Sequence, residues 1–253
     1  MRGASDEHSV FGPRSVGKFF TISNVTNAPS LRLASLVSHG IKAVDEKTYE
    51  SMLNSVSTCT SMIKTCNEKD IGCSLAYTFC NAKLTSPYYA SGLNPYDIRL
   101  PCGDNPLCYD FSMVETWLRS EATLDALHVT SESRKWQSCN NAVNAEFKND
   151  WMKRFDPFVA DLLEAGIRVM IYAGDVDFIC NSLGNKAWTL EFNWSGKEDF
   201  NAASDKEWNN GHGTIRSAKG LTFLEVNDAG HMVPHDQPEV ALDMINQFLA
   251  GQI

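Results

Sequence analysis

Two stretches that end in polar side chains decide the fold of this chain. "IYAGDVDFICN" (Ile171–Asn181) is a short apolar run followed by two acids, Asp175 and Asp177. "LTFLEVNDAGHMVP" (221–234) is a second apolar run, followed by His231. In open parallel sheets, reactive groups gather beyond the carboxyl ends of the strands. The pattern therefore predicts a carboxylate beside an imidazole, an arrangement that orients a histidine base.

Each of these residues also has a simpler interpretation. An Asp-x-Asp sequence after a strand is often a turn or a helix cap. A lone histidine such as His231 is more often a hydrogen-bonded loop residue than a catalytic base. Metal binding by the two acids is weaker still as an interpretation, because no further ligands lie near them in the sequence.

The segments around these runs alternate between helix and strand. We expect a short strand at Gly17–Asn24 and helices at Asp45–Val56 and Met113–Val129. From Asp156 onward the pattern predicts helix, strand, helix, a polar stretch, strand and helix. The expected elements are helix Asp156–Gly166, strand 167–174, helix Gly184–Phe192, strand Leu221–Val226 and a helix from Pro238. This order is typical of an α/β fold with a parallel sheet covered by helices.

Composition and cysteine usage restrict the function. The 253 residues carry a formal charge of −9, which argues against nucleic-acid binding, and no apolar run is long enough to span a membrane. Six of the eight cysteines lie between Cys59 and Cys108, which favours disulfides and an oxidising compartment over zinc. The sequons at Asn24 and Asn193 agree with secretion. Since the N-terminus has no apolar core of a signal peptide, we expect that the true beginning is missing.

Beyond these patterns, residues 59–253 resemble the serine carboxypeptidases of the carboxypeptidase Y and cathepsin A type. "IYAGDVDFICNSLGNKAW" and "LTFLEVNDAGHMVPHDQPEVALDMINQFLAG" are similar to the two C-terminal signature blocks of that family. "TFCNAKLTSPYYASGLNPYDIRLPCGDNPLCYDF" resembles its cysteine-rich cap. The resemblance implies the C-terminal portion of an α/β-hydrolase fold with a disulfide-stapled cap insertion. We divide it into a degraded core strand and the start of the helical cap (1–58), the cysteine-rich cap (59–112) and the hydrolase core (113–253).

The resemblance assigns roles to individual residues. Asp177, the second acid of Gly-Asp-x-Asp, matches the catalytic carboxylate, and His231 matches the general base that it holds. Five further positions match substrate-pocket residues of the family: the aromatic residues Tyr96, Tyr109 and Trp151, the thiol Cys180 and the leaving-group neighbour Met232. The implied disulfides are Cys59–Cys80, Cys66–Cys73 and Cys102–Cys108, and the family's partner for Cys139 belongs to its N-terminal half. No metal or cofactor is implied.

One part of the family's machinery is absent from the sequence. The nucleophile of the family lies in a Gly-x-Ser-x-Gly turn, and this chain contains no such sequence. "GPRSVG" (Gly12–Gly17) is a poor substitute, because Pro13 stands where the first glycine should be and no apolar strand leads into it. We therefore expect the chain alone to release no C-terminal residues from peptides, unless a serine-bearing N-terminal chain joins it.

Two other functions stay open. A catalytically dead remnant could bind a peptide or a partner chain, and some family members perform acyl transfer with the same triad. The expected partner of an active enzyme is a peptide with a free C-terminus. The family implies the secretory pathway, with the vacuole, the lysosome or the exterior as the destination.

Overall fold

A mixed four-stranded sheet lies at the centre of the C-terminal half of the described chain. The computed structural model describes residues 39–105, 107–130 and 135–253. In this part the strand order is β3-β6-β5-β4, with β3 and β6 parallel and the other two neighbouring pairs antiparallel. The strands are β3 (Val169–Gly174), β4 (Lys206–Trp208), β5 (Gly213–Ala218) and β6 (Leu221–Val226).

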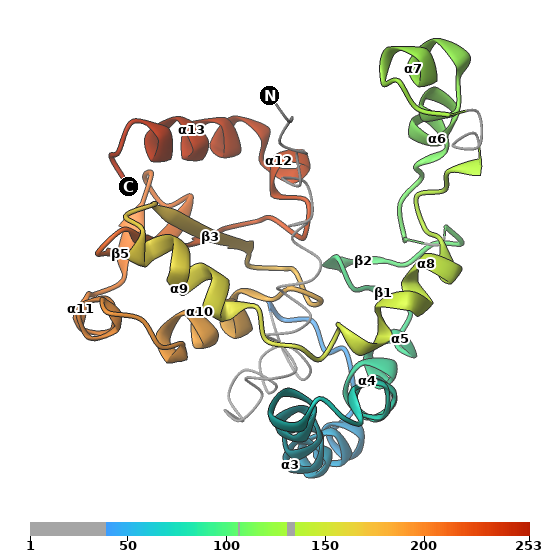
Figure 1. Cartoon of the computed structure of the whole chain (residues 1–253), viewed down its shortest axis with the longest axis horizontal. Helices are drawn as coiled ribbons and strands as arrows, with labels where there is room; N and C mark the ends of the chain where they lie inside the picture. Colours follow the sequence, from blue (N-terminus) through green and yellow to red (C-terminus); the bar gives the residue numbers. More distant parts are fainter. Residues whose placement is uncertain (1–38, 106, 131–134) are drawn as a thin grey trace, which may run out of the picture.

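Helices cover both faces of this sheet (Figure 1). The helices are α9 (Asp156–Glu164), α10 (Ser182–Glu191), α11 (Lys197–Ala202), α12 (Val233–Asp236) and α13 (Pro238–Leu249). Leu221 and Phe223 of β6 pack with buried residues of α9, α10 and α11. Leu224 and Val226 pack on the opposite side with α12 and α13. Successive side chains of a strand point to opposite faces, so the apolar residues on both faces of β6 fit a strand that is covered on both sides.

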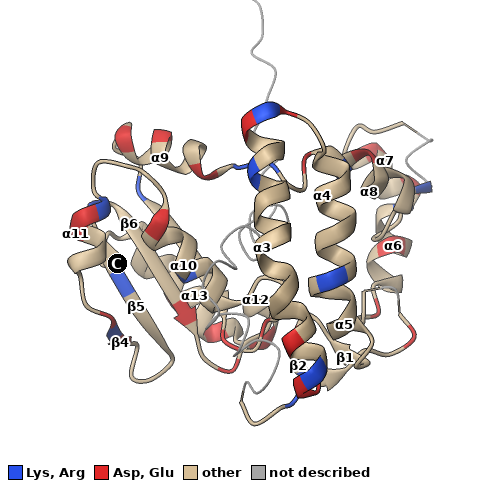
Figure 2. Cartoon of the chain, turned by 90° about the horizontal axis from the view of Figure 1, so that it is seen from below, with Lys and Arg blue, Asp and Glu red and all other residues tan. Residues whose placement is uncertain are grey.

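A second, helical part carries two of the disulfides. It consists of α3 (Glu46–Lys69), α4 (Cys73–Cys80), the π-helix η1 (Asn81–Thr85) and α5 (Ser86–Tyr89). The side chain of Asp45 accepts a hydrogen bond from the Thr48 amide at 2.7 Å and so caps α3. Bonds Cys59–Cys80 and Cys66–Cys73 join α3 to α4, which lie side by side (Figure 2). The pairing is the one that the family resemblance implies.

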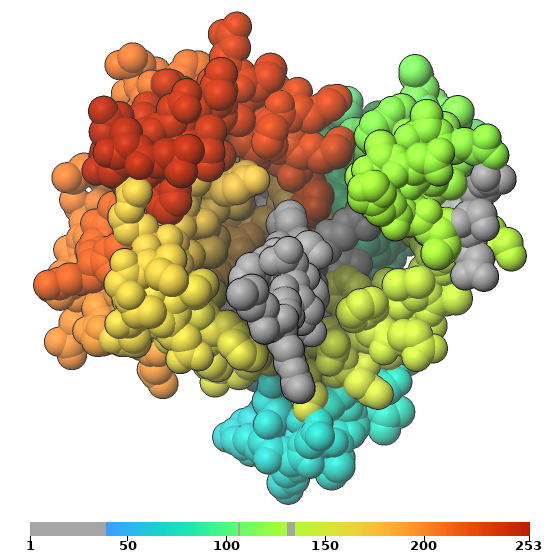
Figure 3. All heavy atoms as spheres, turned by 45° about the horizontal axis from the view of Figure 1, so that its top comes forward, coloured from blue at the N-terminus to red at the C-terminus, as the bar shows by residue number. Residues whose placement is uncertain are grey.

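A small hairpin connects this helical part to the rest. Strands β1 (Leu93–Asn94) and β2 (Asp97–Pro101) pair antiparallel, and Cys102–Cys108 closes the loop that follows. Next come α6 (Ser112–Leu118), α7 (Glu121–Ala126), α8 (Asn141–Glu146) and the 3-10 turn η3 (Phe147–Asn149). The segment of α6 and α7 forms a lobe of its own, drawn in green in Figure 3. Met113 and Trp117 of this lobe are 84% and 62% exposed.

Several sequence expectations were wrong in detail. The two strands expected from the sequence, β3 and β6, are parallel as predicted, but the sheet as a whole is mixed, because the stretch expected to be polar forms β4 and β5. The turn between them uses Asn209, Asn210 and Gly211 at positive φ, which small polar residues and glycine tolerate. The helix expected to end at Val56 continues to Lys69. The single helix expected at 113–129 is two helices, since Ser120 caps α7 through the Thr123 amide.

Of the other expectations, some are confirmed and some are not tested by the structure. Strand β6 has the expected bounds, and α13 begins at Pro238 as expected. The strand expected at Gly17–Asn24 lies outside the described residues. The division at residues 58 and 112 stays a prediction. Among the described residues, no helix is both long enough and apolar enough to cross a membrane.

Candidate active site

The loop after β3 carries two acids, of which Asp177 is buried and Asp175 is partly exposed. The Asp177 side chain is among the most buried charged groups, with the residue 4% exposed, and its Oδ1 accepts a hydrogen bond from the Cys180 amide at 3.1 Å. The next helix starts at once, because Asn181 caps α10 by accepting from the Gly184 amide at 2.8 Å. These local bonds fix the position of the Asp177 carboxylate.

The loop after β6 brings His231 to that carboxylate. His231 Nδ1 lies 2.9 Å from Asp177 Oδ2, although the two residues are 54 positions apart in the chain. The His231 amide donates to the Tyr96 carbonyl at 2.7 Å, which fixes the backbone that carries the imidazole. The sequence pattern predicted that these two side chains lie close together, and the structure has them in hydrogen-bond contact.

Two glycines allow this close approach. A Cβ atom on Gly174 would lie 2.0 Å from the carbonyl oxygen of Ala229, and one on Gly230 would lie 2.2 Å from that of Tyr96. No real Cβ is found so close to a backbone oxygen. Glycine is therefore required where the β3 loop, the β6 loop and the hairpin meet, for packing rather than for an unusual φ.

The hairpin of β1 and β2 contacts both loops. The carbonyl of Pro95 accepts hydrogen bonds from the amides of Phe178 and Ile179, at 3.2 and 2.9 Å. The next carbonyl, that of Tyr96, accepts from His231. The ring of Tyr88, which is fully buried, stacks on Phe178 at 3.6 Å between centroids. Adjacent carbonyls of one hairpin thus set the relative position of the acid and the histidine.

Burial and hydrogen bonding shift the pKa of Asp177 in opposite directions. Burial raises the pKa of Asp177, because a carboxylate loses hydration there, and the hydrogen bond and charge of His231 act in the opposite direction. Burial also raises the pKa of Asp175, although the nearby His39 opposes it. Asp175 has a different set of contacts: its Oδ1 accepts from the Ala229 amide at 3.3 Å. Asp175 thus links the two loops, whereas only Asp177 contacts His231.

Four of the five expected pocket residues lie around this pair. The Tyr96 ring is 5.2 Å from the His231 ring, and the Tyr109 ring is 6.1 Å from that of Tyr96. Cys180 places its sulfur within 4.8 Å of ligand atoms of both Asp177 and His231. Met232 follows His231 directly and is half-buried.

The remaining expected residues lie elsewhere. The Trp151 ring is 6.1 Å from Tyr77 and packs against the apolar core of α3 and α4. Asn193 is exposed after the end of α10, while Asn24 lies outside the described residues. Cys139 is exposed and belongs to none of the three disulfides.

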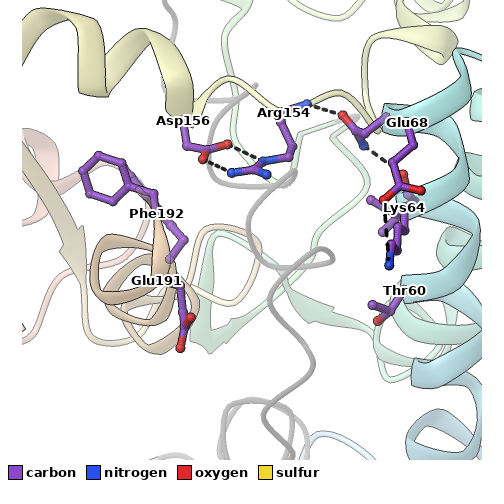
Figure 4. A pocket seen from close by; sticks show the side chains of 10 residues that line it. Thr60, Lys64, Glu68, Arg154, Asp156, Glu191 and Phe192 are labelled. Atoms are coloured by element: carbon purple, nitrogen blue, oxygen red, sulfur yellow. Dashed lines mark hydrogen bonds and ion pairs between the residues drawn. The ribbon is translucent and has the colours of Figure 1, made fainter. Parts of the chain in front are cut away.

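A pocket of about 370 Å³ lies between α3 and α10, and its lining includes neither Asp177 nor His231 (Figure 4). At its rim the guanidinium of Arg154 donates to both carboxylate oxygens of Asp156. Lys64 and Glu68 of α3 form an ion pair at 3.7 Å on the opposite wall. The polar groups of the wall are thus largely paired with one another.

Sequence reasoning missed the residues that position the pair. Tyr88, Asn94 and Asp97 are buried, and none was singled out from the sequence. Tyr88 donates to the Asn94 carbonyl at 3.1 Å, and Asp97 binds Arg99 through two hydrogen bonds of 2.9 and 2.7 Å. The only signal was their place inside the "YYASGLNPYDIR" part of a block that resembles the family.

The fold and the site together define the C-terminal part of an α/β-hydrolase: two strand-end loops that hold an acid against a histidine, with a disulfide-stapled cap. A family model described as serine carboxypeptidase matches residues 24–251, so the chain belongs to the serine carboxypeptidase family. The match and the resemblance of the sequence blocks agree.

Individual relatives are similar over most of this chain. Carboxypeptidase Y homolog A of Leptosphaeria maculans is 41% identical over 218 residues, which are 82% of this chain and 40% of that protein. Carboxypeptidase Y of Candida albicans is 43% identical over 210 residues, 80% of this chain and 38% of that protein. The chain thus spans about 40% of the length of the curated relatives it matches.

A solved structure has the same fold. It is that of Kex1(delta)p, described as a prohormone-processing carboxypeptidase from Saccharomyces cerevisiae, with a TM-score of 0.69 and 22% identity. The similarity covers 92% of this chain and 52% of that one.

Proposed function

We propose that this chain supplies the acid and the histidine of a serine-type carboxypeptidase, which releases C-terminal residues from peptides. The observation that carries the proposal is the 2.9 Å contact between His231 Nδ1 and Asp177 Oδ2 in a chain of the serine carboxypeptidase family. Asp177 holds the imidazole in one tautomer and stabilises the imidazolium that forms when His231 accepts a proton. The other ring nitrogen, Nε2, is then the atom that faces the nucleophile.

The nucleophile has to come from outside the sequence printed here. A serine hydroxyl loses its proton to His231 as it attacks the peptide carbonyl, and His231 returns that proton to the leaving amine. Because this chain has no Gly-x-Ser-x-Gly sequence, we propose a serine-bearing N-terminal segment as its partner. Loss of the nucleophile alone can cost about a million-fold in kcat, so the chain by itself should be inactive.

The substrate would bind between the hairpin and the His231 loop. Tyr96 and Tyr109 form an aromatic wall next to the histidine, and Cys180 and Met232 adjoin it. Trp151 belongs to this proposal through the family resemblance alone. Three disulfides favour an oxidising compartment, so we propose the secretory pathway, with the vacuole, the lysosome or the exterior as the destination.

The test is complementation. The purified chain is incubated at acidic pH with a blocked dipeptide, alone and with the serine-bearing N-terminal half of a relative such as the Candida albicans carboxypeptidase Y. We expect hydrolysis only in the mixture, and its loss when Asp177→Asn or His231→Gln replaces the wild-type chain. His212→Gln is the matched control, since His212 is an exposed histidine of another loop. Hydrolysis by the chain alone would refute the need for an external serine.

The exposed apolar side chains of α6 and α7 favour a second candidate, a non-catalytic protein that binds a partner chain or a peptide. Besides Met113 and Trp117, Leu127 of this lobe is 54% exposed, and exposed apolar groups that gather in one place mark interaction sites. Saturable binding of the blocked peptide without hydrolysis in either mixture would favour this candidate. Hydrolysis restored by the serine-bearing half would contradict it.

A further inference from the structure

Three side chains that commonly bind metal ions meet at the end of the sheet. One carboxylate oxygen of Asp177, the sulfur of Cys180 and one ring nitrogen of His231 all lie within 4.8 Å of one another. A metal there was not expected from the sequence, because His231 is 54 positions from Asp177. In space, the histidine and the thiol supply the further ligands that the acids lacked.

We propose that Asp177, Cys180 and His231 form a binding site for a thiophilic divalent cation of the Zn²⁺ class. The donor set contains one oxygen, one sulfur and one nitrogen, which are the three donor types that Zn²⁺ takes in proteins. Three protein ligands leave a fourth position of a tetrahedral ion for water or another small molecule. Mg²⁺ and Ca²⁺ prefer oxygen ligands only, so this site discriminates against them.

The distances between the three donor atoms are close to those around a bound Zn²⁺ ion. Zn²⁺ lies about 2.0–2.3 Å from oxygen, nitrogen and sulfur ligands, so the donors around it are separated by roughly 3.5 Å. The donor atoms lie within 4.8 Å of one another, so the widest separation has to shorten by about 1.3 Å at most. The hydrogen bond from the Cys180 amide holds the Asp177 carboxylate, and the hydrogen bond from the His231 amide to the Tyr96 carbonyl holds the backbone of His231.

Burial favours a bound ion and leaves a route for its entry. Asp177 and Cys180 are 4% and 8% exposed, whereas the His231 side chain is 13% exposed and forms the outer wall. A carboxylate and a thiolate in this position offer two negative charges to a divalent cation. On binding, the Cys180 thiol releases its proton to solvent, and the sulfur–cation bond replaces the sulfur–hydrogen bond.

The ion would compete with the proposed catalytic role, although its binding does not depend on that role. A cation that takes His231 as a ligand blocks the nitrogen lone pair that would accept a serine proton, so it would inhibit a completed enzyme. Binding by the chain alone requires no serine. Failure of the metal experiment therefore leaves the hydrolysis experiment unaffected, and the reverse also holds.

Co²⁺ is the probe for the test, because a thiolate–Co²⁺ bond gives a strong ultraviolet charge-transfer band. The purified chain is kept free of reductant so that its three disulfides stay intact, stripped of metal, and titrated with Co²⁺ and then with Zn²⁺. We expect the charge-transfer band with Co²⁺ and its disappearance when Zn²⁺ displaces the cobalt. Excess Mg²⁺ should leave the band unchanged.

The variants identify the ligands. Loss of an outer partner of a metal ligand already costs about 10–100-fold in affinity, so Cys180→Ser and His231→Gln should each weaken Zn²⁺ binding more than about 100-fold. Cys139→Ser is the matched control, since Cys139 is the exposed cysteine outside the disulfides. Circular dichroism of each variant checks that it folds, and a Zn²⁺-dependent rise in Tm, expected only for wild type and Cys139→Ser, is the second readout.

Each result of these measurements either supports the proposed metal site or overturns it. A charge-transfer band that is lost in Cys180→Ser and in His231→Gln but retained in Cys139→Ser supports the site. Absence of the band in the folded wild-type chain overturns the proposal. So does a band that disappears in Cys139→Ser, because the cation would then bind the exposed thiol.

Discussion

Replacing Gly174 by alanine should separate the two loops of the candidate active site. The added Cβ would lie 2.0 Å from the Ala229 oxygen and 2.4 Å from the Gly230 oxygen, both of them backbone atoms. Ordinary contacts between non-bonded heavy atoms are about 3.5 Å, so the β3 loop and the β6 loop must move apart by roughly 1.5 Å. No flexible side chain can absorb this movement.

The consequence for the acid–histidine pair follows from the same distances. The contact between Asp177 and His231 is 2.9 Å, and hydrogen bonds of this kind extend to about 3.2 Å. Even half of the expected separation would break it. Overpacking of this kind costs about 1–3 kcal/mol, which for a chain of this size corresponds to a Tm lower by about 2–12 °C.

Thermal unfolding and amide hydrogen exchange measure the effect. In Gly174→Ala we expect a lower Tm and faster exchange of the Val176 amide, which donates to the Ala229 carbonyl at 3.1 Å. Gly103→Ala is the matched control, because a Cβ there would meet nothing within 4 Å. If Gly174→Ala unfolds at the same temperature as wild type and protects Val176 equally well, the reasoning from the close approach is refuted.

Three further predictions concern the groups around the site. Tyr88→Phe removes the hydrogen bond to Asn94 and should lower the free energy of unfolding by about 1 kcal/mol. Tyr88→Ala should lower it by about 3–5 kcal/mol. Equal losses in urea unfolding would contradict the stacking of Tyr88 on Phe178. Removal of the Cys59–Cys80 disulfide by a double alanine substitution should lower the free energy of unfolding by about 3 kcal/mol, because the disulfide joins residues that are 21 positions apart. An unchanged urea midpoint would contradict this prediction. Burial raises the pKa of Asp177 in the folded state above its unfolded value, so ionisation of Asp177 lowers stability as the pH rises through the folded pKa. Asp177→Asn removes this penalty, and its stability relative to wild type should therefore increase with pH in a series of urea titrations, whereas a flat or falling difference would contradict the sign.

The sequence predicted the pair but not the part of the chain that holds it. Asp177 and His231 follow apolar runs and glycines, and strand ends on one edge of a sheet must lie close together. Pro95 and Tyr96 act through their carbonyl oxygens, and a backbone acceptor leaves no trace in residue type. The hairpin of β1 and β2 could therefore be found only from the structure.

The mixed sheet was missed for a related reason. Strand β4 is the edge strand of the sheet and β5 is its neighbour. Lys206 and Glu207 of β4 are exposed, and Arg216 of β5 donates to Asp205 at 2.8 Å. An edge strand needs only one covered face and often carries charged residues. Its sequence is then hard to distinguish from a polar loop. The cysteine pairing, in turn, came from the family resemblance, since spacing alone leaves many connectivities open.

The helical part and the sheet are coupled through the site itself. Tyr88 belongs to α5, which follows the two disulfide-joined helices and η1, and its ring stacks on Phe178 in the loop that carries Asp177. Four residues after α5 ends, the hairpin that binds both loops begins. A change that loosens α3 and α4 should therefore reach the acid–histidine pair through Tyr88, whereas loosening of the exposed lobe of α6 and α7 should not. The cap is in this sense part of the machinery that positions His231, and its disulfides stabilise the site as well as the fold.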